Sequence, residues 1–142
     1  MDKNLLTFLP QDLLVGLFNL EMVSFDNNEI KSLNERIFCD SHKLQLIYFY
    51  NNKLTSIPAG IFYSLANLIK VDFHNNKITS LAEKMFKDTA QLKTVNFASN
   101  KISFLPKNLF AGLAELERCE FDNNHIGKLD ETIFKGMLSF LY

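Results

Sequence analysis

The stretch LIKVDFHNNKITSLAEKMFKDTAQ, residues 68–91, is one of several units of equal length that follow one another along this chain. Its apolar positions and its second asparagine return every 24 residues, and no insertion or deletion breaks the spacing. The shared pattern is LxxVxFxxNxIxxLxxxxFxxxxx. The asparagine column shows the register most clearly and consists of Asn4, Asn28, Asn52, Asn76, Asn100 and Asn124. A fixed period of this length predicts a solenoid, in which stacked units bury a continuous core.

The first letters of each unit predict a short β-strand. Val71 and Phe73 are two residues apart, so a strand directs both side chains to one face, toward the core. Lys70, Asp72 and His74 then point to the opposite face. The connections of about 20 residues are long enough for the crossovers that a parallel sheet requires. Strands are expected near 22–24, 46–48, 70–72, 94–96 and 118–120.

The pattern resembles the leucine-rich repeat family in its typical 24-residue form, with Phe where Leu is commoner at the sixth position. The resemblance extends over residues 4–142. It implies an α/β repeat solenoid, a right-handed superhelix with a concave parallel β-sheet and a mostly irregular convex side. The outward residues of the strands would then form the concave surface.

We expect a single leucine-rich repeat domain over residues 1–142. Neither end shows the cysteine-rich caps of extracellular family members, although solenoids need polar caps at their terminal repeats. We therefore interpret the chain as a fragment of a longer array. Its expected parts are the full repeats 20–43, 44–67, 68–91, 92–115 and 116–139 and the partial repeats 4–19 and 140–142.

The composition argues against several classes of function. The 142 residues are 47% hydrophobic and 22% charged, which fits a folded domain with a real core. The formal net charge is −1, so there is no electrostatic footprint for nucleic acid or for an acidic membrane. No apolar stretch approaches the ~18 residues that a membrane span needs, and the N-terminus lacks the features of a signal peptide.

Two neighbouring asparagine columns have different expected roles. The column that contains Asn76 follows the strand, where the turning backbone would leave buried polar groups unpaired, and an Asn amide can satisfy them. The column one residue earlier lies at the strand exit, where Asn tolerates a left-handed backbone. These residues are expected to be exposed, and they could contribute to binding. They are Asn27, Asn51, Asn75, Ser99 and Asn123.

A second period of 48 residues lies over the first. Pro10, Pro58 and Pro106 recur at this spacing, and the intervening repeats carry other residues at the same position. Duplication of a two-repeat block explains this best. The alternative is that alternate convex turns serve a partner.

The outward positions of the first strands predict a ligand-binding surface. These positions should be polar if nothing binds there, but Met22, Leu46, Tyr48 and Tyr50 form one contiguous patch, with His74 beside Tyr50. Exposed apolar patches rimmed by polar residues mark interaction sites, although single apolar surface residues are common. The candidate ligand-binding residues are Met22, Leu46, Tyr48, Tyr50, Asp72 and His74.

Two charged groups are weaker candidates. Glu117, Glu120 and Asp122 surround Arg118, where a basic partner segment could dock, but a solvated acidic surface is the favoured interpretation. A column of lysines past the asparagines could hold an anionic ligand such as a sulfated glycan, although solvated edge lysines are commoner. This column consists of Lys53, Lys77 and Lys101.

The residues do not predict an enzyme, a metal site or a cofactor. Asp72 and His74 share a face, but no nucleophile lies within reach, and the three histidines occupy different repeat positions. Cys119 replaces a core residue, whereas Cys39 lies on a convex turn, about 20 Å away and beyond the ~7 Å limit for a disulfide. Cys39 is expected to be a free thiol, with pairing to another chain left open. The sequence contains no Asn-x-Ser/Thr acceptor.

These features favour a non-catalytic module that binds a protein ligand on its concave face. The resemblance implies a secreted or cell-surface protein of the receptor, adhesion or innate-immunity kind, similar to Toll-like receptor ectodomains, Slit-like guidance proteins and insect immune proteins. Two alternatives remain open. The chain could be a structural repeat spacer, or it could be the substrate-targeting domain of a multidomain enzyme.

Overall fold

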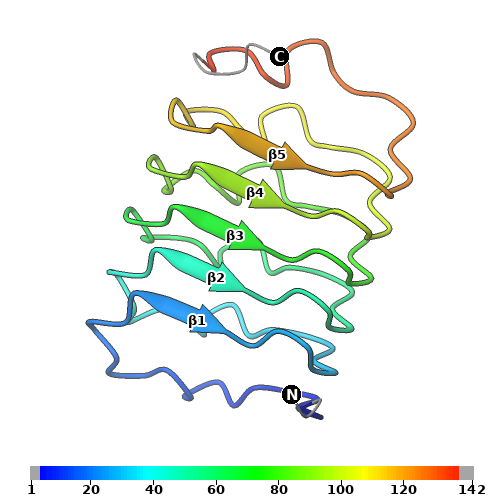
Figure 1. Ribbon diagram of the computed structural model, residues 1–142. Coiled ribbons are helices and arrows are strands. Elements are labelled where there is room, and N and C mark those ends of the chain that lie inside the picture. The colour runs from blue at the N-terminus through cyan, green and yellow to red at the C-terminus, as the bar shows by residue number, and fades with distance from the viewer. Residues whose placement is uncertain (1–3, 138–142) are drawn as a thin grey trace.

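A computed structural model describes residues 4–137 and contains one parallel β-sheet. Its strands follow one another in chain order, and each residue pairs with the residue 24 positions later, such as Val71 with Val95 (Figure 1). The strands occupy the expected positions. They are β1 (Met22–Ser24), β2 (Leu46–Tyr48), β3 (Lys70–Asp72), β4 (Thr94–Asn96) and β5 (Arg118–Glu120).

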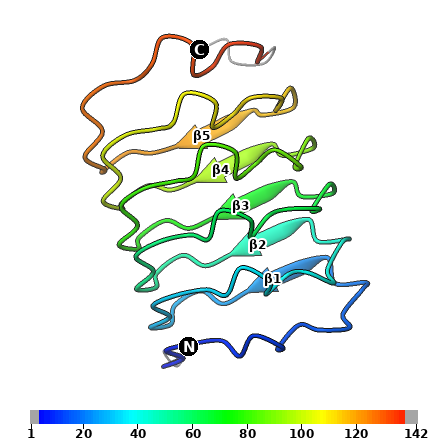
Figure 2. The ribbon, with the colours of Figure 1, turned by 180° about the vertical axis from the view of Figure 1, so that it is seen from behind.

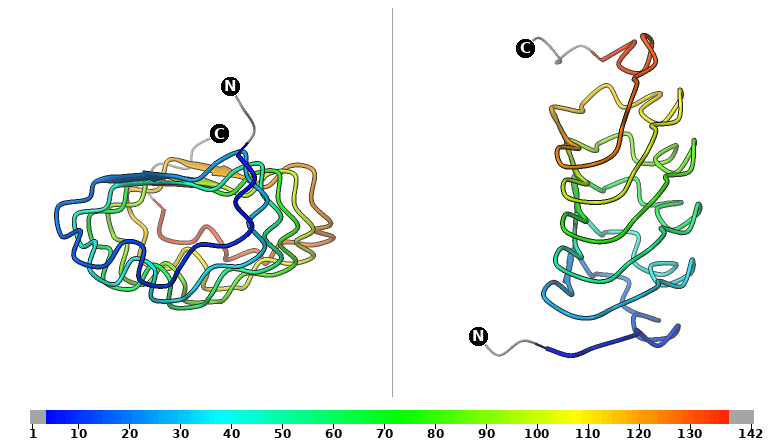
Figure 3. Two further views of the ribbon diagram at one scale, coloured as in Figure 1. Left: turned by 90° about the horizontal axis from the view of Figure 1, so that it is seen from below. Right: turned by 90° about the vertical axis from the view of Figure 1, so that its right-hand side faces the viewer.

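The chain winds into a coil with the sheet along one side. Figure 3 shows the coil along its axis, where successive turns lie nearly over one another, and from the side, where they form a stack. Figure 2 shows from behind the loops that run across the back of the sheet. This arrangement confirms the predicted solenoid. We call the side of the sheet that faces away from the coil interior the sheet face, and it corresponds to the concave surface of the prediction.

The convex side consists of turns. Residues 4–137 contain no helix, so the α component of the expected α/β class is missing from this part of the chain. Backbone hydrogen bonds there span three residues, as from Ile61 N to the Pro58 oxygen at 3.2 Å and from Tyr63 N to the Gly60 oxygen at 3.0 Å. Such bonds close isolated turns, whereas an α-helix needs a run of bonds that span four residues.

Two columns of phenylalanine rings fill the interior. Phe73 stacks between Phe49 and Phe97 with ring centroids 5.5 Å apart on either side, and all three rings are fully buried. The second column meets the first edge-on, as where Phe62 lies 6.1 Å from Phe73. The columns therefore form the core, as the sequence predicts.

The inner asparagine column ties the repeats together. Oδ1 of Asn76 accepts a hydrogen bond from Leu54 N at 3.0 Å, and Nδ2 donates to the Phe49 and Phe73 oxygens at 2.9 and 3.0 Å. Asn52, Asn100 and Asn124 make equivalent bonds. Each amide thus links the backbone of its own repeat to that of the preceding one, which is the structural role predicted for this column.

The 48-residue period has a structural counterpart on the convex side. Asp40 Oδ2 accepts from Gly16 N at 2.9 Å, and Asp88 Oδ2 accepts from Ser64 N at 3.0 Å. Gly16 and Ser64 both have positive φ angles, of 79° and 65°, so a carboxylate from the next repeat holds each of these turns. The alternation therefore has a structural role within the chain, since these carboxylates hold alternate turns.

Candidate functional site

Strand register places the predicted binding residues in three parallel rows on the sheet face. Met22 and Leu46 share the first row with Lys70, and Tyr48 shares the second with Asp72. The third row lies just beyond the strand ends, where backbone hydrogen bonds continue across neighbouring repeats. This row consists of Asp26, Tyr50 and His74.

Tyr50 and His74 form the closest ring contact of the site. Their rings stack with centroids 4.8 Å apart and planes 6° from parallel. Tyr48 meets Tyr50 edge-on, with centroids 6.3 Å apart and an interplanar angle of 82°. The prediction that His74 lies beside Tyr50 is therefore correct, and these three rings form one aromatic surface.

Asp72 is less exposed than the sequence predicts. It lies on the sheet face as predicted, but only 6% of it is accessible, and His74 and Lys70 lie against its carboxylate. Its Oδ1 contacts His74 Nδ1 at 2.7 Å and accepts a hydrogen bond from His74 N at 3.2 Å. The carboxylate thus holds the His74 ring in the position where it stacks on Tyr50.

Asp26 completes the cluster from the other side. Its carboxylate accepts hydrogen bonds from Ser24 Oγ, from Asn27 Nδ2 at 2.6 Å and from the Tyr50 hydroxyl. Partial burial acts to raise the pKa of Asp26, but these hydrogen bonds outweigh it and hold the pKa below its ordinary value. Asp26 is therefore an ionised acceptor beside the aromatic surface.

The same hydrogen bond also shifts the pKa of Tyr50. Because the Tyr50 hydroxyl donates a hydrogen bond to Asp26, the pKa of the phenol is raised. Burial and the negative charges of Asp26 and Asp72 add to the shift. The phenol of Tyr50 is therefore held in its protonated form, as a hydrogen-bond donor to Asp26.

Lys70 lies next to Tyr48 and Asp72. Its Nζ lies 5.2 Å from the centre of the Tyr48 ring and 4.0 Å from Asp72 Oδ2. Lys70 and Asp26 were not among the predicted site residues. Their outward positions were visible in the sequence, but their contacts with the tyrosines depend on which side chains face each other across strands. We refer to six residues together as the aromatic–acidic cluster: Asp26, Tyr48, Tyr50, Lys70, Asp72 and His74.

The aliphatic part of the predicted patch is smaller than its aromatic part. Met22 is 54% exposed and pairs in register with the half-buried Leu46. The next residue in this row is Lys70, so the apolar strip ends at β3. Four of the predicted residues thus lie on the first three strands, and Tyr50 and His74 lie just beyond the ends of β2 and β3.

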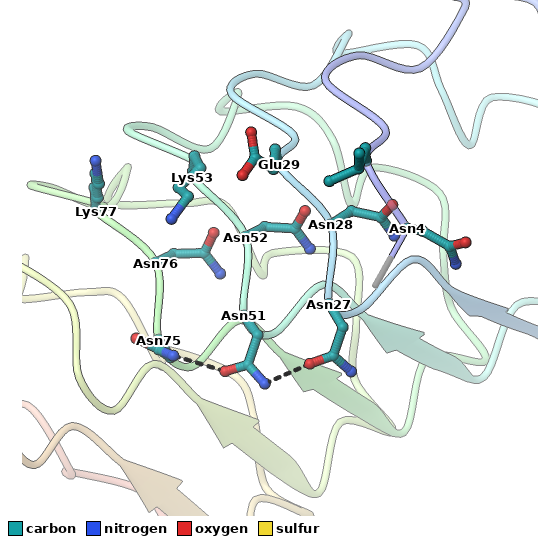
Figure 4. Close-up of a pocket in the computed structure, with 11 residues that line it drawn as sticks. Asn4, Asn27, Asn28, Glu29, Asn51, Asn52, Lys53, Asn75, Asn76 and Lys77 are labelled. Atoms are coloured by element: carbon teal, nitrogen blue, oxygen red, sulfur yellow. Dashed lines mark hydrogen bonds between the residues drawn. The ribbon is translucent and has the colours of Figure 1, made fainter. Parts of the chain in front are cut away.

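A polar groove runs along the rim beyond the strand ends. It has a volume of about 350 Å³, and its lining includes Lys53 and Lys77 of the predicted lysine column. Figure 4 shows the amides of Asn27, Asn51 and Asn75 in one line, joined by hydrogen bonds of 2.8 and 2.7 Å, with Asn51 half-buried between its two exposed neighbours. The adjacent asparagine pairs in the sequence were the feature from which this ladder could have been predicted.

The left-handed backbone predicted for the exposed asparagine column is present. Asn27, Asn51, Asn75, Ser99 and Asn123 have φ angles of 57°, 55°, 53°, 55° and 55°. Because the chain turns at these residues, their side chains leave the sheet face and form the rim.

The charged residues of the last strands pair with one another. Lys93 Nζ lies 3.3 Å from Glu117, and Arg118 contacts Glu120. These pairs are exposed, and each acidic partner already has a cation beside it. The arrangement agrees with the favoured interpretation of a solvated surface.

The two cysteines have different surroundings. Cys39 is exposed on the convex side, whereas Cys119 is partly buried on β5, and burial raises the pKa of the Cys119 thiol to about 12. Neither cysteine forms a disulfide.

We expect a thiol reagent at pH 8 to label Cys39 quickly and Cys119 only after unfolding. A thiol with a pKa of about 12 is ionised in about one molecule in ten thousand at that pH, and the thiolate is the reactive form. Peptide mapping by mass spectrometry identifies the labelled residue, and Cys39→Ser is the matched control that should remove the fast reaction. Fast labelling of Cys119 in the folded protein would contradict its burial.

Among residues 4–137, no helix is long and apolar enough to cross a membrane. The same residues contain no group of three or more His, Cys, Asp or Glu side chains that could hold a metal ion.

The fold defines a parallel β-solenoid of 24-residue turns with an asparagine ladder and a phenylalanine core. The family model for the BspA type leucine rich repeat region matches residues 9–140 with 6 copies. The chain therefore belongs to the leucine-rich repeat family, as the sequence pattern predicts. A comparison with curated proteins finds no match.

Solved structures show the same fold. One is Toll in the Toll–Spatzle complex of Drosophila, with a TM-score of 0.79 and 25% identity over 84% of this chain. Another is the leucine-rich repeat domain of APL1B, with a TM-score of 0.75 and 20% identity over 82% of this chain. The matched region spans 17% of the Toll chain and 33% of the APL1B chain.

Proposed function

We propose that this chain is a non-catalytic protein-recognition module of a larger secreted or cell-surface receptor, adhesion or immune protein. It binds a protein ligand on the sheet face. The binding residues are Met22, Leu46, Tyr48, Tyr50, Asp72 and His74.

The observation that carries this proposal is the organisation of the aromatic–acidic cluster. Tyr48, Tyr50 and His74 are half-buried and packed against one another. Hydrogen bonds to the carboxylates of Asp26 and Asp72 hold two of these rings. Rigid aromatic surfaces contribute much contact area at little entropic cost, and Tyr is enriched among interface hot spots.

The comparisons support the same class of function. Leucine-rich repeat domains commonly mediate protein–protein recognition, and the Toll chain that resembles this one was solved as a complex with Spatzle. A structural spacer needs only turns that stack, and such turns give no reason for an ordered aromatic surface on two consecutive repeats.

We expect the double substitution Tyr48→Ala and Tyr50→Ala to weaken partner binding about tenfold or more, because it removes the aromatic surface. The immobilised chain is exposed to secreted proteins of its source organism, and retained proteins are quantified by mass spectrometry. The affinity of each retained protein is then measured with purified components.

The matched control is Tyr63→Ala. Tyr63 lies on the convex side and is 41% exposed, so its loss should leave partner retention unchanged. Thermal unfolding of all variants checks that the repeats stay folded. A partner retained equally by the double variant would place binding elsewhere, and retention of nothing by any variant would favour the spacer.

A further inference from the structure

One carboxylate oxygen of Asp72 is engaged by His74, and the other accepts no hydrogen bond from the described residues. Asp72 is 6% exposed, and its Oδ1 contacts the ring nitrogen and the backbone nitrogen of His74. Among residues 4–137, its Oδ2 accepts no hydrogen bond, and the charged group beside it is Lys70 Nζ at 4.0 Å. This oxygen accepts no hydrogen bond within the described residues and is not sealed from solvent, because Ser41 Oγ is the one buried side-chain polar atom without a partner there. It is therefore open to an incoming donor that carries positive charge.

Lys70 lies beside this oxygen but does not donate a hydrogen bond to it. Its ammonium lies 5.2 Å from the centre of the Tyr48 ring, a cation–π distance, but 4.0 Å from Asp72 Oδ2 exceeds a hydrogen bond. The Lys70 side chain is 35% exposed. A long, partly solvated lysine can move into solvent at little cost, so Lys70 marks a cation position that an incoming group can take.

We propose that this position receives an arginine side chain of the protein partner. The guanidinium lies on the face of Tyr48 and donates to Asp72 Oδ2, and Lys70 moves out into solvent. The inference rests on the proposed function, because it names the chemistry of the partner at the same surface.

Arginine fits this position better than a second lysine. A guanidinium is planar, stacks on aromatic rings, is more weakly hydrated than an ammonium and offers several donors in a fixed geometry. The charges of the cluster agree, because the carboxylates of Asp26 and Asp72 outnumber the single ammonium of Lys70. Once Lys70 has moved away, the remaining negative charge is available to the arginine.

The test uses three small probes: N-acetylarginine amide, the neutral isostere N-acetylcitrulline amide, and N-acetyllysine amide. Binding to the folded chain is followed by NMR shifts of the Tyr48 and His74 rings. We expect measurable binding of the arginine probe, weaker binding of the lysine probe and none of the citrulline probe. Equal shifts with citrulline, no binding of arginine, or equal affinity for lysine would each overturn the assignment.

Two variants locate the binding position. Lys70→Met removes the competing ammonium and should lower the dissociation constant of the arginine probe at least threefold. Adding Asp72→Asn to this variant should raise the constant at least tenfold relative to Lys70→Met alone. Lys93→Met is the matched control, because Lys93 pairs with Glu117 at 3.3 Å, and it should change nothing. Weaker binding by Lys70→Met would contradict the proposal.

Failure of this inference is distinguishable from failure of the proposed function. If the partner depends on Tyr48 and Tyr50 but the arginine probe does not bind, the surface is a binding site of another chemistry. If the probe binds as expected but partner binding does not depend on Tyr48 and Tyr50, the cation position exists while the proposed function is wrong.

Discussion

Replacing Asn76 with alanine should lower the free energy of unfolding by about 3 kcal/mol, because it removes bonds to buried backbone groups in two repeats. Leu54 N loses Oδ1 of Asn76, its hydrogen-bond acceptor, and the Phe49 and Phe73 oxygens each lose a donor. An unpaired buried N–H group alone costs about 1–3 kcal/mol. Such a loss is large against the ~5–15 kcal/mol that stabilises a typical domain.

Urea unfolding followed by circular dichroism measures this change. The matched control is Asn75→Gly, a substitution at the neighbouring residue. Asn75 is exposed and has a φ of 53°, which glycine adopts without strain, so its loss should cost less than about 1 kcal/mol. If the two variants are equally stable, the inner asparagines do not hold the repeats together.

Replacing Phe73 with alanine should cost about 3–5 kcal/mol, the usual range for removal of a buried aromatic side chain. Phe73 is fully buried, with Phe49 and Phe97 stacked on its two faces and Phe62 at its edge. The substitution leaves a cavity in the middle of the ring column. Because repeats are stabilised mainly by their neighbours, this central position interrupts contacts in both directions.

Two further variants make this prediction specific. Phe73→Leu should cost only about 1 kcal/mol, because leucine restores most of the apolar volume. Phe104→Ala is the matched control, since Phe104 is 54% exposed, and its effect should stay within about 0.5 kcal/mol. A similar loss for Phe73→Ala and Phe104→Ala in urea unfolding would show that the ring column is not the core.

The predicted elements rest on positions that repeat without exception. The strand at 70–72, the buried Phe73 and the amide bonds of Asn76 all follow from a single 24-residue register. A parallel sheet of identical turns leaves no choice of strand order or pairing, because each strand meets the equivalent residues of the next turn. The fold could therefore be predicted almost completely, with the exception of the backbone form of the convex segments.

The site could be predicted only in part. Strand alternation indicated that Tyr48, Tyr50 and Asp72 share a face and that His74 lies beside Tyr50. Alternation does not report the size of neighbouring side chains, so it missed the burial of Asp72 and the position of Lys70 over the Tyr48 ring. It also missed the rim groove, which depends on the direction in which each exposed asparagine leaves its turn.

The sequence by itself determined the solenoid, its strands and the residues of its core, because these depend on positions that are the same in every repeat. Only the tertiary structure decided how the variable letters act together. The stack of Tyr50 on His74 and the bond of Asp26 to Tyr50 join side chains of neighbouring repeats, and the contacts of Asp72 with His74 and Lys70 join side chains within one repeat. These contacts depend on rotamers and local packing, which a periodic pattern does not specify.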